Sequence, residues 1–169
     1  MDELLMWVRS VISTTPERWQ RMTQVYPIEL LTAPPAPKEW SAVECLVHII
    51  ETEKVFNTRL EAFLAGHDFP AVNPDQQGSN RDPSLTLSGL AAEFALMRQA
   101  SLKALEAITL ADLDRCVRHA ELGPVTLGQM LNEWAGHDLM HTVQAERAMM
   151  QPFIEGCGPW QIYFKDHKA

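Results

Sequence analysis

Two histidines, His137 and His141, stand four residues apart in a stretch of sequence that favours a helix. On a helix this spacing projects both imidazoles from one face, where they can chelate a single metal ion. The helical period places further apolar or uncharged residues on that face, which is therefore expected to point toward a core: Met130, Trp134, Gln144 and Ala148. Because the spacing is short and common, a pair of hydrogen-bonded core histidines is the alternative interpretation.

The helix that carries both histidines is predicted to run from Thr126 to Gln151. Thr126, followed three residues later by Gln129, forms a capping-box pattern that marks a helix start. No proline interrupts the segment before Pro152, where the helix is expected to end.

A second helix is predicted to begin at the capping box Ser41-Ala42-Val43-Glu44 and to end near Ala65, before Gly66. His48 lies at the edge of the apolar arc of this helix. A lone histidine in such a position is more often a core residue with satisfied hydrogen bonds than a metal ligand.

The remaining segments predict an all-α fold. Residues 3–13 form a short amphipathic helix, Thr15-Pro16 either opens another helix or kinks the first, and a further helix starts at Thr86. Residues 66–85 form a long loop, and no alternation of useful length indicates a strand. We therefore expect an antiparallel four-helix bundle with a long connection between helices 2 and 3 and a C-terminal extension.

Composition limits the classes of partner. The chain has 169 residues and a formal net charge of −8, which argues against a nucleic-acid surface, and we expect one domain over residues 1–169. We expect no membrane span and a cytoplasmic location, because the apolar runs are short and the N-terminus lacks a signal-peptide pattern. The three cysteines, without a CxxC motif, are expected to be reduced: Cys45, Cys116 and Cys157.

Two regions of the sequence resemble the DinB-like superfamily. The segment from Glu39 to His48, together with Glu53 and the pair Arg59-Leu60, resembles the second-helix signature of that family. The segment from Ala135 to His141 resembles its fourth helix. The segment that precedes this helix also resembles the family, at Leu113-Asp114-Arg115, His119, Gly123 and Thr126-Leu127.

The resemblance implies a four-helix bundle with a metal site made by three histidines, which are His48, His137 and His141 in this sequence. Zinc and nickel both suit imidazole ligands, and a site with three neutral ligands leaves positions open for water or substrate. Family members with known activity include mycothiol-dependent maleylpyruvate isomerases and S-transferases that use mycothiol or bacillithiol. The resemblance therefore implies a small-molecule substrate, and a low-molecular-weight thiol as cosubstrate.

Our leading hypothesis is a divalent-metal-dependent enzyme similar to a thiol S-transferase, with a metal-activated thiol or water. Glu51 is a fourth ligand or a base in this hypothesis, although its helical angle favours a surface carboxylate. Asp138 either accepts a hydrogen bond from a ligand histidine and so orients its ring, or is an ordinary residue on the flank of the helix. Arg59, on the same face as His48, either meets an anionic substrate or extends from the end of the bundle.

Two alternatives remain. One is a non-catalytic stress-response or interaction protein in which the metal is structural or absent, with Cys45 as a possible closing ligand or, more simply, a buried apolar cysteine. The other is a metal-dependent hydrolase; a peptidase of the HExxH type is disfavoured because Asp138 replaces the glutamate base. A homodimer is expected from the family and from the aromatic tail, which contains Trp160, Tyr163 and Phe164.

Overall fold

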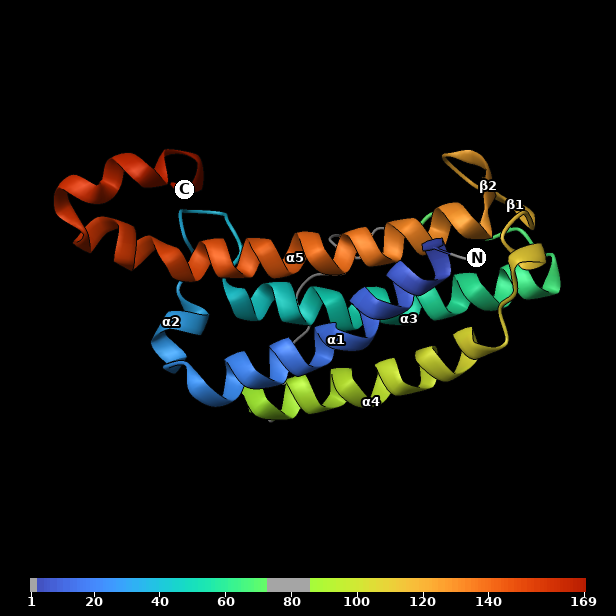
Figure 1. The fold of residues 1–169 in the computed structure, drawn as a ribbon, viewed down its shortest axis with the longest axis horizontal. Helices are drawn as coiled ribbons and strands as arrows, with labels where there is room; N and C mark the ends of the chain where they lie inside the picture. The colour runs from blue at the N-terminus through green and yellow to red at the C-terminus, as the bar shows by residue number, and fades with distance from the viewer. Residues whose placement is uncertain (1–2, 73–85) are drawn as a thin grey trace.

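Four long helices make up the molecule, as predicted (Figure 1). The computed structural model describes residues 3–72 and 86–169. The long helices are α1 (Glu3–Val25), α3 (Ala42–Ala65), α4 (Leu87–Glu106) and α5 (Leu127–Gly156), and a short helix α2 (Ile28–Thr32) joins the first two. Most of the predicted loop at 66–85 lies outside the described residues.

The four long helices do not all run in the same direction along the bundle. In Figure 1, α1 and α5 run one way along the bundle, and α3 and α4 run the other way. The pairs α1 with α4 and α3 with α5 are therefore antiparallel, whereas α3 and α4 are parallel. A parallel pair needs a connection long enough to return along the bundle, and residues 66–86 separate α3 from α4 in the sequence.

Side-chain caps fix the starts of the two helices that carry the histidines. The backbone N–H of Ser41 donates to Glu44 Oε2 over 2.7 Å, and the backbone N–H of Thr126 donates to Gln129 Oε1 over 2.8 Å. Each cap residue also accepts from the third residue of its helix, so both predicted capping boxes are present. At the other end of α3, Gly66 adopts φ 72°, the left-handed conformation that glycine favours.

Two prolines lie inside helices. Pro16 is buried within α1, which is one continuous helix from Glu3 to Val25. Pro152 lies inside α5, so the prediction that this helix ends at Gln151 is wrong. A proline costs one backbone hydrogen bond, and burial of apolar residues beyond each proline, Trp19 in α1 and Ile154 in α5, offsets that cost.

A short β-hairpin corrects the expectation that no strand is present. Strands β1 (Cys116–His119) and β2 (Gly123–Thr126) pair antiparallel just before α5. His119 is buried, and its Nδ1 accepts the backbone N–H groups of Glu121 and Leu122 in the turn. His119 therefore shapes this turn, which leads the chain into the cap of α5.

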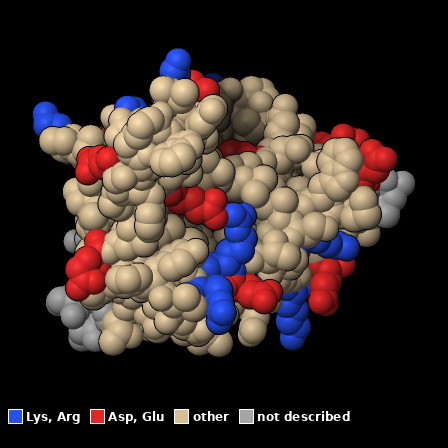
Figure 2. Space-filling view, turned by 60° about the vertical axis from the view of Figure 1, so that its left-hand side comes forward, with Lys and Arg blue, Asp and Glu red and all other residues tan. Residues whose placement is uncertain are grey.

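The C-terminal extension folds back against the end of α5. It forms a 3₁₀ segment, η3 (Gly158–His167), and the Arg147 side chain donates to the backbone carbonyls of His167 and Lys168. Trp160 and Tyr163 remain exposed. On the face drawn in Figure 2, acidic and basic side chains are interspersed over a mostly uncharged surface. The expected homodimer stays a prediction.

None of the helices in the described part of the chain combines the length and the apolar content that are needed to cross a bilayer.

A buried ionic network joins the four long helices. Arg98 of α4 is 1% exposed and donates to Glu53 of α3 over 2.8 and 2.9 Å and to Asp138 of α5 over 2.6 and 3.0 Å. Its Nη1 also donates to the backbone carbonyl of Ile12 in α1 over 2.8 Å. Burial by itself lowers the pKa of Arg98, but the bonds to Asp138 and Glu53 outweigh it and the pKa is raised, so the guanidinium stays charged.

We predict that Arg98→Met lowers the free energy of unfolding by roughly 3–5 kcal/mol, because it leaves Glu53 and Asp138 buried without their cation. Chemical denaturation of the purified variant measures this change. Arg18→Met is the matched control, since the Arg18–Glu146 pair is exposed and is expected to contribute no more than about 1 kcal/mol. Equal effects of the two substitutions would contradict a structural role for the network.

Candidate metal centre

The structure brings the three predicted histidines together between α3 and α5. One ring nitrogen from each of His48, His137 and His141 lies within 4.8 Å of the other two. The closest approach joins Nε2 of His48 to Nε2 of His137 at 3.0 Å. His141 is buried and the other two are half-buried. The cluster therefore joins residues that are 89 positions apart in the sequence.

Aromatic side chains pack around the cluster. The Trp40 ring lies 4.8 Å from the His48 ring and stacks on the His141 ring at 5.7 Å, measured between centroids. Phe56 meets the edge of His137 at 5.6 Å. Because Trp40 directly precedes the N-cap residue of α3, the capping box also fixes where this ring enters the site. These contacts restrict how the imidazoles can turn.

The environments of His137 and His141 suit metal binding. Burial, reinforced by the neighbouring His141 and His48, lowers the pKa of His137 to about 3, so this ring is neutral near pH 7. His141 Nδ1 lies 2.8 Å from the side-chain oxygen of Gln144. An amide oxygen only accepts, so His141 must donate from Nδ1, which leaves the lone pair on Nε2. Neutral imidazoles with lone pairs are the form that binds metal.

The spacing fits a divalent metal. Three nitrogens bound tetrahedrally at about 2.0–2.1 Å from one ion lie about 3.3 Å from one another. The 3.0 Å approach of His48 and His137 and the 4.8 Å limit for all three pairs bracket that value. The buried Nδ1 of His137 has no hydrogen-bond partner among the described residues, so the histidine cluster does not satisfy every buried polar atom of its rings.

Cys45 does not close the site. It is fully buried within an apolar cluster that contains Leu46 and Ile49. Burial, with a smaller contribution from the charge of Glu44, raises the pKa of its thiol to about 12. Metals bind the thiolate, which is scarce at such a pKa. The structure therefore supports a buried apolar cysteine, and the described residues offer the metal three protein ligands.

A cavity of about 270 Å³ opens beside the three histidines. Thr52, Val55, Phe56 and Arg59 line it from α3, and Glu133 and Met140 line it from α5. Arg59 Nη1 lies 3.6 Å from Glu133 Oε2. The cavity places one cationic side chain and several apolar ones next to the imidazoles, which is a common composition for a small-molecule site.

The structure places Arg59 in the cavity but puts the other two predicted side chains elsewhere. Glu51 is absent from the cavity lining and forms an ion pair with Lys54 over 2.8 Å, because it lies on the outer side of α3. Asp138 is buried and its carboxylate is held by Arg98, so it belongs to the core network and is not placed to act as the predicted histidine orienter. Gln144 contacts a histidine instead.

Sequence reasoning assigned no role to three contributors to the site. Trp40 and Gln144 contact the histidines, and Glu133 faces Arg59. Helical period had placed Gln144 on the face of His137 and His141, and it could also have found Glu133, which lies four residues before His137. Trp40 precedes its helix, and no periodicity predicts its position.

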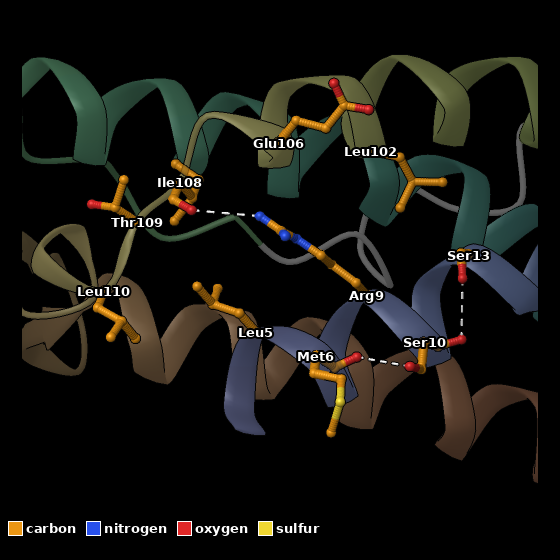
Figure 3. Close-up of a pocket in the computed structure, with 10 residues that line it drawn as sticks. All are labelled: Leu5, Met6, Arg9, Ser10, Ser13, Leu102, Glu106, Ile108, Thr109 and Leu110. Atoms are coloured by element: carbon orange, nitrogen blue, oxygen red, sulfur yellow. Dashed lines mark hydrogen bonds between the residues drawn. The ribbon is translucent and has the colours of Figure 1, made fainter. Parts of the chain in front are cut away.

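A larger cavity lies elsewhere in the described part of the structure. It has a volume of about 740 Å³ and lies between α1 and the end of α4 (Figure 3). Its described lining contains no histidine or cysteine, and its arginine, Arg9, already donates to the backbone carbonyls of Leu105 and Ile108. The chemistry of the lining therefore favours the smaller cavity as the functional site.

Comparisons with known proteins agree with this architecture. A family model described as the DinB superfamily matches residues 12–145, which confirms the resemblance. Among solved structures, Bacillus subtilis YfiT matches with a TM-score of 0.76 and 16% identity, over 90% of this chain and 89% of that one. YfiT is described as "a probable metal-dependent hydrolase with an unusual four-helix bundle topology". No curated protein matches the sequence.

We predict that Gln144→Ala weakens zinc binding by about tenfold, because the Nδ1 of His141 loses the acceptor that fixes its tautomer. Competition with a chromophoric chelator measures the zinc affinity. Gln99→Ala, on the exposed face of α4, is the control and should leave the affinity unchanged. Zinc affinities that are the same in both variants and the wild type would show that Gln144 does not position the ligand.

Proposed function

The chain belongs to the DinB superfamily, and we propose from this premise that it is a divalent-metal-dependent enzyme. His48, His137 and His141 would hold the metal, and a small-molecule substrate would enter the adjoining cavity. The single observation that carries the proposal is the convergence of three ring nitrogens within 4.8 Å beside a cavity of about 270 Å³.

A site with three protein ligands supports a catalytic role. Structural zinc sites are usually closed by four protein ligands, whereas catalytic sites keep a position for water or substrate. A divalent ion held in this way lowers the pKa of a bound water or thiol and so supplies a nucleophile near pH 7. Zinc and nickel are both compatible with three imidazoles, and we propose one of these two ions.

The protein's own groups would orient the substrate and limit access of water. Phe56 and Val55 give the cavity an apolar wall on α3, and Met140 covers it from α5. Trp40 shields the opposite side of His48 and His141. Because the imidazoles stand on two long helices, their positions are set before any ligand arrives.

We propose that the nucleophile is a low-molecular-weight thiol, so that the enzyme is similar to a thiol S-transferase. The thiolate would attack an electrophilic carbon of the substrate and displace its leaving group. The support for this choice is the resemblance to thiol-dependent members of the family. Hydrolysis, with water in the same role, is the second candidate, and the description of YfiT favours it.

Metal content tests the proposal first. Protein purified without a histidine tag should contain about one zinc or nickel ion per chain, and His137→Ala should lose it. Elemental analysis by mass spectrometry measures both. His67→Ala, at an exposed position just beyond α3, is the matched control and should retain the metal. Wild-type protein that binds neither ion after addition at neutral pH would rule out the enzyme and leave a bundle with core histidines.

Binding of a thiol distinguishes the two candidate reactions. Addition of cysteine to the cobalt-substituted protein should produce a thiolate-to-cobalt charge-transfer band in the near ultraviolet, because a thiolate can occupy the open position. The band should also appear in His67→Ala and be absent from His137→Ala. If cysteine, mycothiol and bacillithiol all fail to produce the band in a protein with full cobalt occupancy, the transferase is excluded and hydrolysis becomes the leading reaction.

A further inference from the structure

We propose that Arg59 recognises the carboxylate of the substrate, and that the substrate is a small monoanion with an apolar part next to this carboxylate. The inference rests on the proposed function, because it concerns the cavity beside the three histidines. Arg59 and these histidines line one cavity of about 270 Å³, so a single small molecule can contact both.

The Arg59 side chain has hydrogen-bonding capacity that the described part of the protein leaves unused. The side chain is 14% exposed. Its Nε is buried and has no hydrogen-bond partner among the described residues. A buried donor without an acceptor is unfavourable, and a ligand that supplies an oxygen would remove this cost. The planar fork of a guanidinium matches the two oxygens of a carboxylate.

The ion pair of Arg59 is loose enough to admit a second anion. Arg59 Nη1 lies 3.6 Å from Glu133 Oε2, which is longer than a hydrogen bond between charged groups. The Glu133 side chain is 53% exposed and can turn toward solvent. Glu133 therefore acts as a weak competitor for the guanidinium, and its removal should favour an external carboxylate.

Aromatic rings hold the guanidinium in place. Its central carbon lies 5.5 Å from the centroid of the Phe69 ring and 6.0 Å from that of Phe56, distances typical of cation–π contacts. Phe56 also meets the edge of His137 at 5.6 Å. The same ring thus separates Arg59 from the histidines and offers an apolar surface between them. A substrate that spans the two would place its apolar part against Phe56 and Val55.

The charge at the Arg59 end of the cavity favours a group with a single negative charge. Among the described lining residues, Arg59 is the one with a fixed positive charge, and Glu133 contributes a carboxylate, whereas the charge of the proposed metal would lie at the histidine end. A phosphate dianion at the Arg59 end would meet one cation and one anion, so its second charge would have no protein partner there. A carboxylate needs a single cation and uses both arms of the fork, which is why we assign this class.

Binding of benzoate, with neutral benzamide as the matched probe, tests the inference. The readout is the side-chain Nε–H signal of Arg59 in nitrogen–proton correlation spectra, identified by its loss in Arg59→Met. Benzoate should shift this signal and bind at least tenfold more tightly than benzamide, because benzamide lacks the charge that Arg59 pairs with. An unshifted Arg59 signal, or equal binding of the two probes, would overturn the inference.

Variants at both ends of the ion pair sharpen the test. Arg59→Met should weaken benzoate binding at least tenfold and leave benzamide unaffected, and Arg59→Lys should retain part of the binding through its charge. Glu133→Gln should tighten benzoate binding about two- to fivefold, because it removes the competing carboxylate. Arg18→Met and Glu146→Gln, from an exposed ion pair elsewhere, are the matched controls and should change nothing. Benzoate binding that is insensitive to both Arg59 and Glu133 would also overturn the inference.

The design separates this inference from the metal proposal. Benzoate titrations are carried out on protein stripped of metal by a chelator and on protein loaded with zinc. Arg59-dependent binding in the stripped protein supports the inference even if the wild type proves to hold no metal. Binding that requires zinc and does not depend on Arg59 would mean that the carboxylate joins the metal directly, which contradicts the role of Arg59 and leaves the metal centre intact.

Discussion

The buried guanidinium of Arg98 is the contact on which the arrangement of the helices depends. Arg98 belongs to α4, and its guanidinium donates hydrogen bonds to two carboxylates, on α3 and α5, and to one backbone carbonyl on α1. A guanidinium can do this because it has five donors in one plane. An apolar residue at this position could pack against the other three long helices, but it would not fix the position of each helix along its axis. The directional hydrogen bonds of Arg98, which are 2.6 to 3.0 Å long, fix these positions.

The registers set by Arg98 also determine where the three histidines meet. Glu53 lies five residues after His48 on α3, and Asp138 directly follows His137 on α5. Holding both carboxylates on one cation therefore aligns the two helices so that the imidazoles meet. A chain of contacts connects the network to the site: Trp134 donates to Glu53 over 3.2 Å and stacks on Phe56 at 4.9 Å between centroids. Phe56 in turn meets His137, so packing and bonding converge on the ligand geometry.

Local sequence patterns were sufficient for the starts of α3 and α5 and for two of the three histidines. Caps at Ser41 and Thr126 and the spacing of His137 and His141 are short-range features, and the structure reproduces them. The third histidine came only from the family resemblance, because no local period tells which face of α3 meets α5. The sequence analysis did not predict the β-hairpin, because strands of four residues are too short to show an alternation of apolar and polar side chains.

The role of Arg98 was missed although the sequence contains a sign of it. Arg98 and Ser101 occupy positions in the same helical stripe as Leu90, Phe94 and Leu105, all of which are buried. A charged residue in an apolar stripe predicts a buried partner, and Glu53 holds the corresponding position on α3. The sequence does not show that Asp138 also pairs with Arg98, because this contact depends on which helices are neighbours in the bundle.

The buried network and the cavity are built from different residues of the same helices. All described side chains that line the cavity, apart from Val72, stand on one face of α3 or one face of α5. The residues that hold these two helices in register lie deeper in the core and do not line the cavity. Substitutions at the cavity positions can therefore alter the shape and charge of the cavity without moving the histidines.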